Sequence, residues 1–251
     1  MLFPAYETIP GDPSRGYLIV CDHASNAVPP ELGDLGLPEA AFARHIAYDI
    51  GVRAVTLGLA ERLGVPAVLS CFSRLVIDPN RGEDDPTLLM RLSDGAVIPG
   101  NAHADATERE RRLEAYYRPY HAAVTAAIET SLQAGQRPAL ISIHSFTPYW
   151  KETPRPWHAG VLWSHDPRLA VPLLKALSAC SGLIVGDNEP YSGELEGDCM
   201  YRHGTLRDLP HALVEIRQDL IDRPDGVAEW ITRLADIFSD LSQDPAIWAV
   251  R

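Results

Sequence analysis

Short apolar runs alternate along the chain with longer stretches in which apolar residues recur at helical spacing. Runs of strand length occupy residues 17–21, 66–71, 74–78, 139–143, 159–163, 182–186 and 211–217. Apolar residues recur every three or four positions, as in amphipathic helices, over residues 40–63, 107–135, 167–179 and 226–241. This alternation predicts a three-layer α/β/α sandwich around a central sheet. The sheet should be mixed, because several connections between strands are too short to hold a crossover helix.

Residues that start, stop or interrupt helices refine this pattern. Gly64 is a predicted C-cap, and Thr107 with Glu110 is a predicted capping box. Pro119 predicts a kink or break near Arg118. Two segments rich in Gly or Pro, 82–106 and 148–156, are predicted to be loops long enough to lie over a site. Without internal repeats or low-complexity tracts, we expect one domain over residues 1–251.

Two of the predicted strands end in histidine. The run 139–143 stops at His144, and the run 17–21 leads into Asp22 and His23. The carboxyl ends of strands are where open α/β sheets build their sites. One histidine after a strand is more often a hydrogen-bonded structural residue than a ligand. Two histidines at two strand ends, however, can converge on one metal ion.

Two further pairs of residues each have two interpretations. His45 and Asp49 fall four apart and so on one face of the predicted helix, either as a surface pair or as part of a site. Asn80 and Arg81 follow the predicted strand 74–78, where a guanidinium suits a carboxylate. The alternative for this pair is an Asx-type turn with a solvated arginine.

Glu215 is unusual because it lies within an apolar run of the last predicted strand. An ionised side chain there is costly unless it is paired or beside a metal ion. Arg217, two residues on and so on the same face, could be its partner. The functional interpretation makes Glu215 a general base, because a partly desolvated carboxylate has a pKa suited to taking a proton from water.

Composition and charge narrow the choice of partners and location. The 251 residues carry a net charge of −12 and no basic run, which argues against nucleic acid or anionic lipid as a partner. The first residues lack the features of a signal peptide and no stretch is long enough to span a membrane, so we expect a cytoplasmic protein without membrane contact. The four cysteines show no Cys-x-x-Cys spacing and are expected to be reduced, mostly buried thiols.

Taken together, these motifs resemble the N-formylglutamate amidohydrolase family, whose fold is related to zinc carboxypeptidases and aspartoacylases, the zinc-exopeptidase-like group. Each motif is weak alone, but their order and spacing are specific. The matching segments are Asp22–Asn26 with the following Val28–Pro29, His45–Asp49, Ser73–Arg81, Tyr117–His121, Ile143–Ser145, Asn188–Gly193 and Glu215–Asp219.

The resemblance implies a role for each matching residue. His23 and His144 would bind one zinc ion per chain, and Glu215 would be the catalytic base. Asn80 and Arg81 would hold the substrate carboxylate. Asn26 stands where the related enzymes have a glutamate as third ligand, and an amide oxygen binds zinc less well than a carboxylate. The third ligand is therefore Asn26 or a carboxylate from elsewhere, such as Asp49 or Asp22.

The function implied is zinc-dependent hydrolysis of the acyl C–N bond of a small anionic N-acyl amino acid such as N-formyl-L-glutamate, a reaction of histidine degradation. Because the chain is acidic, a dianionic substrate needs local positive charge, from Arg81 first and then from Arg202, with His203 as a further donor. Two alternatives remain: a homologue that binds small molecules without catalysis, and a deacylase or peptidase for larger acylated substrates. The sequence does not predict the oligomeric state.

Overall fold

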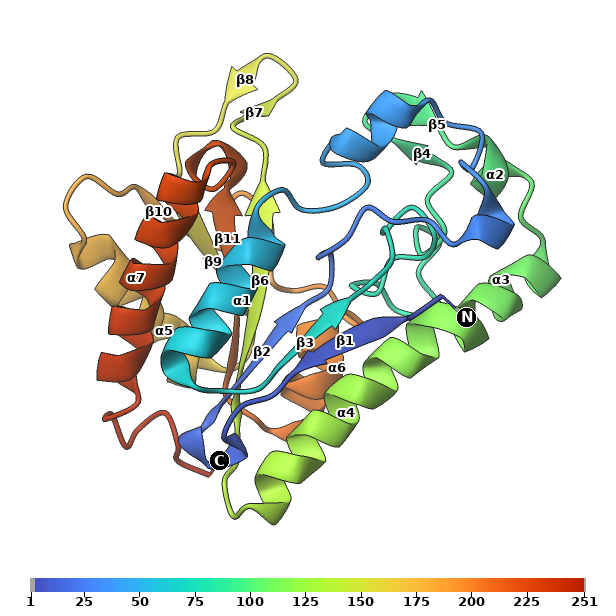
Figure 1. Cartoon of the computed structure of the whole chain (residues 1–251). Helices are drawn as coiled ribbons and strands as arrows, with labels where there is room; N and C mark the ends of the chain where they lie inside the picture. Colours follow the sequence, from blue (N-terminus) through green and yellow to red (C-terminus); the bar gives the residue numbers. More distant parts are fainter. Residues whose placement is uncertain (1–2, 251) are drawn as a thin grey trace.

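A seven-stranded mixed sheet forms the centre of the computed structural model, which describes residues 3–250 (Figure 1). The strand order is β1-β3-β2-β6-β11-β9-β10. Neighbouring strands are parallel except for the pairs β1/β3 and β11/β9. The prediction of a mixed sheet is confirmed. The strands are β1 (Tyr6–Ile9), β2 (Tyr17–Cys21), β3 (Ala67–Ser70), β6 (Ala139–Phe146), β9 (Ala159–Leu162), β10 (Val185–Asp187) and β11 (His211–Arg217).

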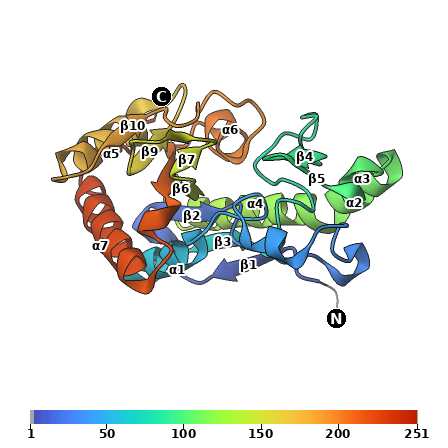
Figure 2. The same cartoon turned by 90° about the horizontal axis from the view of Figure 1, so that it is seen from above.

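Helices cover both faces of this sheet, which confirms the three-layer α/β/α sandwich. One core lies under α1 (Val52–Leu63), α5 (Pro167–Ala179) and α7 (Pro224–Leu241). The other lies under α4 (Arg118–Gln133) and α6 (Cys199–His203), and Figure 2 shows α1 and α4 on opposite sides of β2 and β3. Side chains of β6 alternate between the two cores, with Ile141 in the first and Leu140 in the second. β6 is buried throughout, as its continuous apolar run predicts.

The two segments that were predicted as loops contain short regular elements. Residues 82–106 hold the hairpin of β4 (Leu92–Ser93) and β5 (Ala96–Val97), followed by α2 (Pro99–Ala102). Residues 148–156 hold the hairpin of β7 (Tyr149–Trp150) and β8 (Thr153–Pro154). In Figure 1 the two hairpins rise on either side of the carboxyl ends of the central strands.

The predicted helix over residues 40–63 is wrong in its first half. A short 3-10 turn covers Glu39–Ala43, and α1 begins only at Val52. Gly51, with φ 84°, is in the left-handed region, which a continuous α-helix cannot contain. His45 and Asp49 therefore do not share a helix face. Asp49 is instead free to turn toward the sheet.

Residues 74–78 form a turn and not the predicted strand. The amide of Val76 donates to the carbonyl of Ser73 at 2.8 Å, and the Arg74 guanidinium reaches Asp78 at 2.7 Å. The apolar side chains of this turn pack beneath it and are buried. A short apolar run in the sequence looks the same whether it forms a buried strand or a buried turn. The strand predicted at 182–186 begins only at Val185, and β1 was not predicted.

Helix boundaries agree in part with the sequence signals. Gly64 is the C-cap of α1, with φ 66°. The predicted capping box at Thr107 is wrong, because Asp105 caps α3 (Ala106–Arg112) by accepting from the amide of Glu108. The helix is not broken at Arg118, where a kink or break was predicted; instead a π-helical turn, Leu113–Tyr117, lies directly before α4, and Pro119 falls in the first turn of α4. Such turns insert one extra residue and let the two helical segments face different neighbours.

The structure also gives the burial of the four thiols and the character of the helices. Cys21, Cys71, Cys180 and Cys199 are free, the first and last being buried and the other two half-buried. Within residues 3–250, no helix is long and apolar enough to cross a membrane.

Arg112 fixes α3 to the turn at residues 74–78, and its loss should destabilise the fold. Its buried guanidinium donates to the Val76 carbonyl at 2.8 Å and to Asn101 Oδ1 at 2.6 Å. Arg112→Met should lower the free energy of unfolding by about 3 kcal/mol, because two buried acceptors lose their donor. The exposed Arg111 on the same helix pairs with Glu108, and Arg111→Met should cost less than about 1 kcal/mol. Urea unfolding of both variants measures the difference, and equal costs would contradict this role for Arg112.

Candidate active site and metal centre

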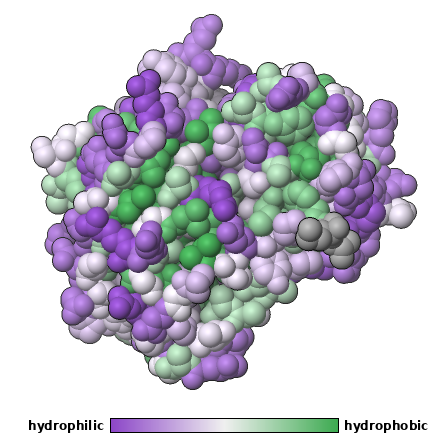
Figure 3. Space-filling model, in the orientation of Figure 1, coloured by the Kyte–Doolittle hydropathy of each residue, from purple (hydrophilic) through white to green (hydrophobic). Residues whose placement is uncertain are grey.

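The carboxyl ends of β2, β6 and β11 open into a cavity of about 480 Å³. His23, His144 and Glu215 line it, and Glu215 is the direct register partner of His144 on the neighbouring strand. Both hairpin segments contribute to the walls, Ser93 from one and Trp150 from the other. The face drawn in Figure 3 is hollowed between these two segments, with hydrophilic residues along the rim. The cavity is of the size that small-molecule ligands fill.

His23, Asp49 and His144 form a buried group at the base of the cavity. One potential ligand atom from each lies within 4.8 Å of the others. Asp49 Oδ2 is 2.8 Å from His144 Nδ1 and 3.3 Å from His23 Nδ1. The two imidazole rings meet edge to face, with centroids 4.9 Å apart. A single carboxylate oxygen thus faces the same nitrogen of both rings.

The other nitrogen of each ring is held by a second carboxylate. His23 Nε2 donates to Asp78 Oδ1 at 2.7 Å, and His144 Nε2 donates to Asp22 Oδ2 at 3.1 Å. A carboxylate behind a histidine fixes the orientation of the ring and leaves the opposite nitrogen for a metal ion. Both Nδ1 atoms are therefore turned toward the point at which a metal ion would bind.

The electrostatics of this group favour bound positive charge. Burial alone would raise the pKa of Asp22 and Asp49, but hydrogen bonds and charge from the histidines hold both below their usual range. The pKa of Asp78 is also well below its usual range, because the charges of Arg74 and His23 outweigh its burial. Burial would lower the pKa of His144, yet its bonds to Asp22 and Asp49 raise it well above the usual value. Ionised carboxylates thus surround the imidazoles, and a cation stabilises them.

Glu215 differs from these carboxylates because it forms no ion pair with any residue in 3–250. It is 6% exposed, and its Oε2 atom has no hydrogen-bond partner among residues 3–250. Burial raises the pKa of Glu215 to about 7. The alternative pairing with Arg217 is wrong, because Arg217 bonds to Asp219 at 2.8 Å. A buried carboxylate with a raised pKa beside a histidine cluster is suited to proton transfer.

The residues present fit a zinc ion. Two imidazole nitrogens and a carboxylate oxygen are a known type of zinc ligand set that leaves a fourth position open. Asn26, which was predicted as third ligand, lies apart from this group. It is exposed, and its amide donates to the Phe42 carbonyl at 2.7 Å, because the loop after His23 turns away from the sheet edge. Asp49, the predicted alternative, lies between the two histidines.

Asn80 and Arg81 line the same cavity. The Asx turn is present, since Asp78 Oδ1 accepts from the amide of Asn80 at 2.9 Å. Asn80 is buried and accepts from the Cys199 amide at 3.1 Å, while the Arg81 guanidinium bonds to the Asn80 carbonyl at 3.2 Å. Within residues 3–250, no carboxylate lies within ion-pair distance of Arg81. Its charge is available to an anion in the cavity.

Arg202 and His203 do not line this cavity, contrary to the sequence prediction. They border a separate pocket of about 360 Å³ together with Arg118 and Arg207. Arg202 donates to the hydroxyl of Tyr117 at 2.9 Å, and His203 is buried against His121. They belong to α6, and that short helix turns these two side chains toward α4.

Comparison with protein families gives a match to N-formylglutamate amidohydrolase over residues 15–222. The chain belongs to the N-formylglutamate amidohydrolase family. Among solved structures it is similar to a gene product of Agrobacterium tumefaciens, with 32% identity, a TM-score of 0.88 and 94% of each chain covered. It is also similar to the N-formylglutamate amidohydrolase from Ralstonia eutropha, with 22% identity, a TM-score of 0.73, and 95% of this chain and 97% of that chain covered. Comparison with curated proteins found no match.

Membership of the N-formylglutamate amidohydrolase family confirms the resemblance found in the sequence. Family and fold together support an amide-cleaving hydrolase. Several cavity residues were nevertheless not identified as part of the site. Arg74 pairs with Asp78 and approaches Asp49 at 3.5 Å, and Tyr191 accepts from Arg155 at 3.1 Å. Arg74, Asp78 and Tyr191 all lie in matching segments, and this was the signal for them. Nothing in the sequence near Arg155, which contacts Tyr191 but does not line the cavity, distinguished it from a loop arginine.

Proposed function

We propose that this chain is a zinc-dependent amidohydrolase that cleaves the acyl C–N bond of a small anionic N-acyl amino acid, with N-formyl-L-glutamate as the first substrate to test. One observation carries the proposal. His23 and His144 direct the same nitrogen at one oxygen of Asp49, beside a buried Glu215 oxygen that has no partner among the described residues. This arrangement supplies metal ligands and a proton acceptor within one cavity.

His23, Asp49 and His144 would hold the ion, and Asp78 and Asp22 would keep the two imidazoles in position. Bound zinc polarises an acyl carbonyl and makes water a better nucleophile at neutral pH. His23 and His144 would offer their Nδ1 atoms to the ion, and Asp49 would offer Oδ2. Any proton carried by these ligand atoms would be released to solvent on zinc binding.

Glu215 would carry the proton that the reaction moves. It accepts a proton from the water whose oxygen attacks the acyl carbon, and it gives that proton to the amine nitrogen as the C–N bond breaks. The products are a carboxylic acid, formate for a formyl group, and the free amino acid. The cavity's two hairpin segments would limit the access of bulk water to this step.

Arg81 would bind a substrate carboxylate, with Asn80 keeping the turn in place. A charge-assisted contact of this kind contributes about 1.5–3 kcal/mol. The alternative of an inactive binding homologue rested on Asn26 as a poor ligand, and the position of Asp49 beside both histidines supports the enzyme instead. Substrates larger than an N-acyl amino acid are the remaining alternative, and the cytoplasmic location and role in histidine degradation belong to the same proposal.

Arg81→Ala should raise KM for acidic N-acyl substrates by roughly ten- to a hundredfold while leaving the zinc content intact. Arg81→Lys should recover only part of the loss, because an ammonium cannot form the two-pronged contact of a guanidinium. Steady-state kinetics and metal analysis measure both effects. Arg202→Ala serves as the comparison, because Arg202 borders the other pocket and its loss should change KM little. An unchanged KM for Arg81→Ala on every acidic substrate would assign Arg81 to an ordinary turn.

The experiment that tests the proposed function is a screen of N-acyl amino acids with zinc-loaded protein, with N-formyl, N-acetyl and N-succinyl forms of acidic and neutral amino acids. We expect hydrolysis of acidic substrates with small acyl groups. Calorimetry on the same compounds separates catalysis from binding. Tight binding without hydrolysis of any compound would favour the inactive homologue and contradict the proposal.

A further inference from the structure

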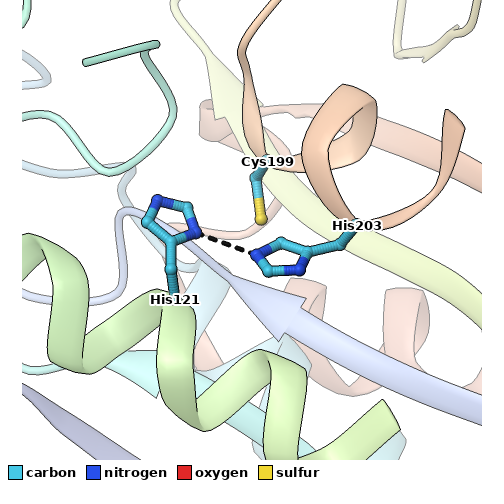
Figure 4. Close-up of side chains that lie close together, drawn as sticks. All are labelled: His121, Cys199 and His203. Atoms are coloured by element: carbon cyan, nitrogen blue, oxygen red, sulfur yellow. Dashed lines mark hydrogen bonds between the residues drawn. The ribbon is translucent and has the colours of Figure 1, made fainter. Parts of the chain in front are cut away.

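A second group of potential metal ligands lies between α4 and α6, outside the proposed active site. It consists of His121 from α4 and of Cys199 and His203 from α6, as Figure 4 shows. One ligand atom from each lies within 4.8 Å of the others. The group shares no residue with His23, Asp49 and His144. His121 ends the segment Tyr117–His121, one of the family motifs, which the proposed reaction does not use.

The geometry of this group follows from helix periodicity. Cys199 and His203 are four residues apart and so point to the same side of α6, toward His121. His121 Nδ1 and His203 Nε2 are 2.9 Å apart. Two nitrogens on one tetrahedral zinc ion at normal bond lengths are separated by about 3.3 Å. The imidazoles need to move apart by only a few tenths of an ångström to become ligands.

The single hydrogen bond between the two buried imidazoles does not use all of their ring nitrogens. His121, Cys199 and His203 are 4%, 0% and 1% exposed. One N–H···N bond joins the two rings, and His121 has a further backbone contact at Pro79, while His203 Nδ1 has no partner among the described residues. A buried ring nitrogen left unpaired in this way costs about 1–3 kcal/mol. Unpaired buried polar atoms of this kind call for a bound ion or water.

We propose that His121, Cys199 and His203 bind a second divalent cation of the zinc class. One thiolate and two imidazoles favour Zn²⁺ over Mg²⁺ or Ca²⁺, which prefer oxygen ligands. On binding, Cys199 gives up the proton with which its thiol bonds to Asp22, and this proton leaves to solvent. The ion takes the place of the hydrogen bond between the two rings. The proposal does not depend on the proposed reaction.

The neighbouring pocket provides an entry path for the ion and for a water molecule as fourth ligand. Its volume is about 360 Å³, and both histidines border it. Arginines also border it, but Arg118 pairs with Glu110 at 2.6 Å and Arg207 with Glu129 at 2.9 Å. These glutamates offset two of the three arginine charges at the entrance, and the third, Arg202, donates to the Tyr117 hydroxyl.

The bound ion would fix one wall of the active-site cavity. α6 contributes Met200 and Tyr201 to that wall, and its N-cap Asp198 lines it as well. Joining α6 to His121 would hold the helix against α4. The second ion is therefore a structural one in this proposal, placed behind the active site and not within it.

Cobalt substitution tests the proposal directly in the whole protein. A thiolate bound to Co²⁺ gives an intense charge-transfer absorption in the near ultraviolet, whereas His23, Asp49 and His144 contain no sulfur. Metal-free protein titrated with Co²⁺ should develop this absorption together with a second equivalent of bound metal. Saturation with cobalt without the absorption would overturn the proposal, and this result needs no variant.

Matched cysteine variants locate the thiolate. Cys199→Ser should abolish the absorption and one equivalent of metal, while Cys71→Ser, at a half-buried thiol outside both groups, should keep both. His144→Ala should lose the other equivalent and keep the absorption. An absorption that survives Cys199→Ser, or a wild-type protein that binds a single equivalent which His144→Ala removes, would contradict the proposal.

Discussion

Glu215→Gln should reduce turnover by about 10²- to 10⁴-fold, the contribution expected of a positioned general base. The amide keeps the shape of the side chain but cannot accept the proton of the attacking water. The fold should survive, because Glu215 makes no ion pair with Arg217, which bonds to Asp219. Steady-state rates measure the first effect and circular dichroism melting the second.

Stability gives this experiment a second readout. Burial raises the pKa of Glu215 to about 7. Between about pH 4.5 and pH 7 the folded protein therefore holds a proton on this group that the unfolded chain has lost. The contribution of Glu215 to the free energy of unfolding falls as the pH rises through that window. Metal-free Glu215→Gln avoids this cost and should melt at or above the wild-type temperature at pH 8. The exposed Glu196, which does not line the cavity, provides the control Glu196→Gln, which should change neither rate nor melting. A lower melting temperature with a near-normal rate would assign Glu215 a structural role.

Asp49→Ala should lower zinc affinity at the proposed active site by about a hundredfold or more, since even the loss of a residue behind a ligand costs ten- to a hundredfold. Asp49 is the residue whose carboxylate faces both histidines. Asn26→Ala is the matched control, because Asn26 is exposed and bonds to the Phe42 carbonyl. Competition with a zinc indicator measures both affinities. Loss of zinc in Asn26→Ala with retention in Asp49→Ala would restore the ligand set first predicted from the sequence.

The positions of His23 and His144 near the ends of two strands could be predicted because neighbouring residues in the sequence determine them. An apolar run that leads to a histidine predicted each strand and the end near which the side chain lies, although β6 continues past His144 to Phe146. His23 and His144 meet because β2 and β6 are adjacent and parallel, and Glu215 joins them through its register with His144. Apolar pattern and order along the chain were sufficient for this part of the site.

Asp49 and Arg202 show where sequence information ends. Asp49 reaches the histidines because α1 begins only after Gly51, whose backbone is in the left-handed region. The helical spacing of apolar residues continued in the sequence before Gly51, so the helix was predicted to start too early. Arg202 precedes β11 closely in sequence, but the orientation of α6 directs it to the other pocket. Both positions depend on packing between elements distant in sequence, which periodicity does not encode.

The measurement that tests the central claim most directly is formate release from N-formyl-L-glutamate by metal-free protein titrated with zinc. We expect activity to rise with the zinc bound at His23, Asp49 and His144, to be lost on chelation, and to be absent at every zinc concentration in Glu215→Gln. Activity that is independent of zinc, or unchanged in Glu215→Gln, would contradict the account.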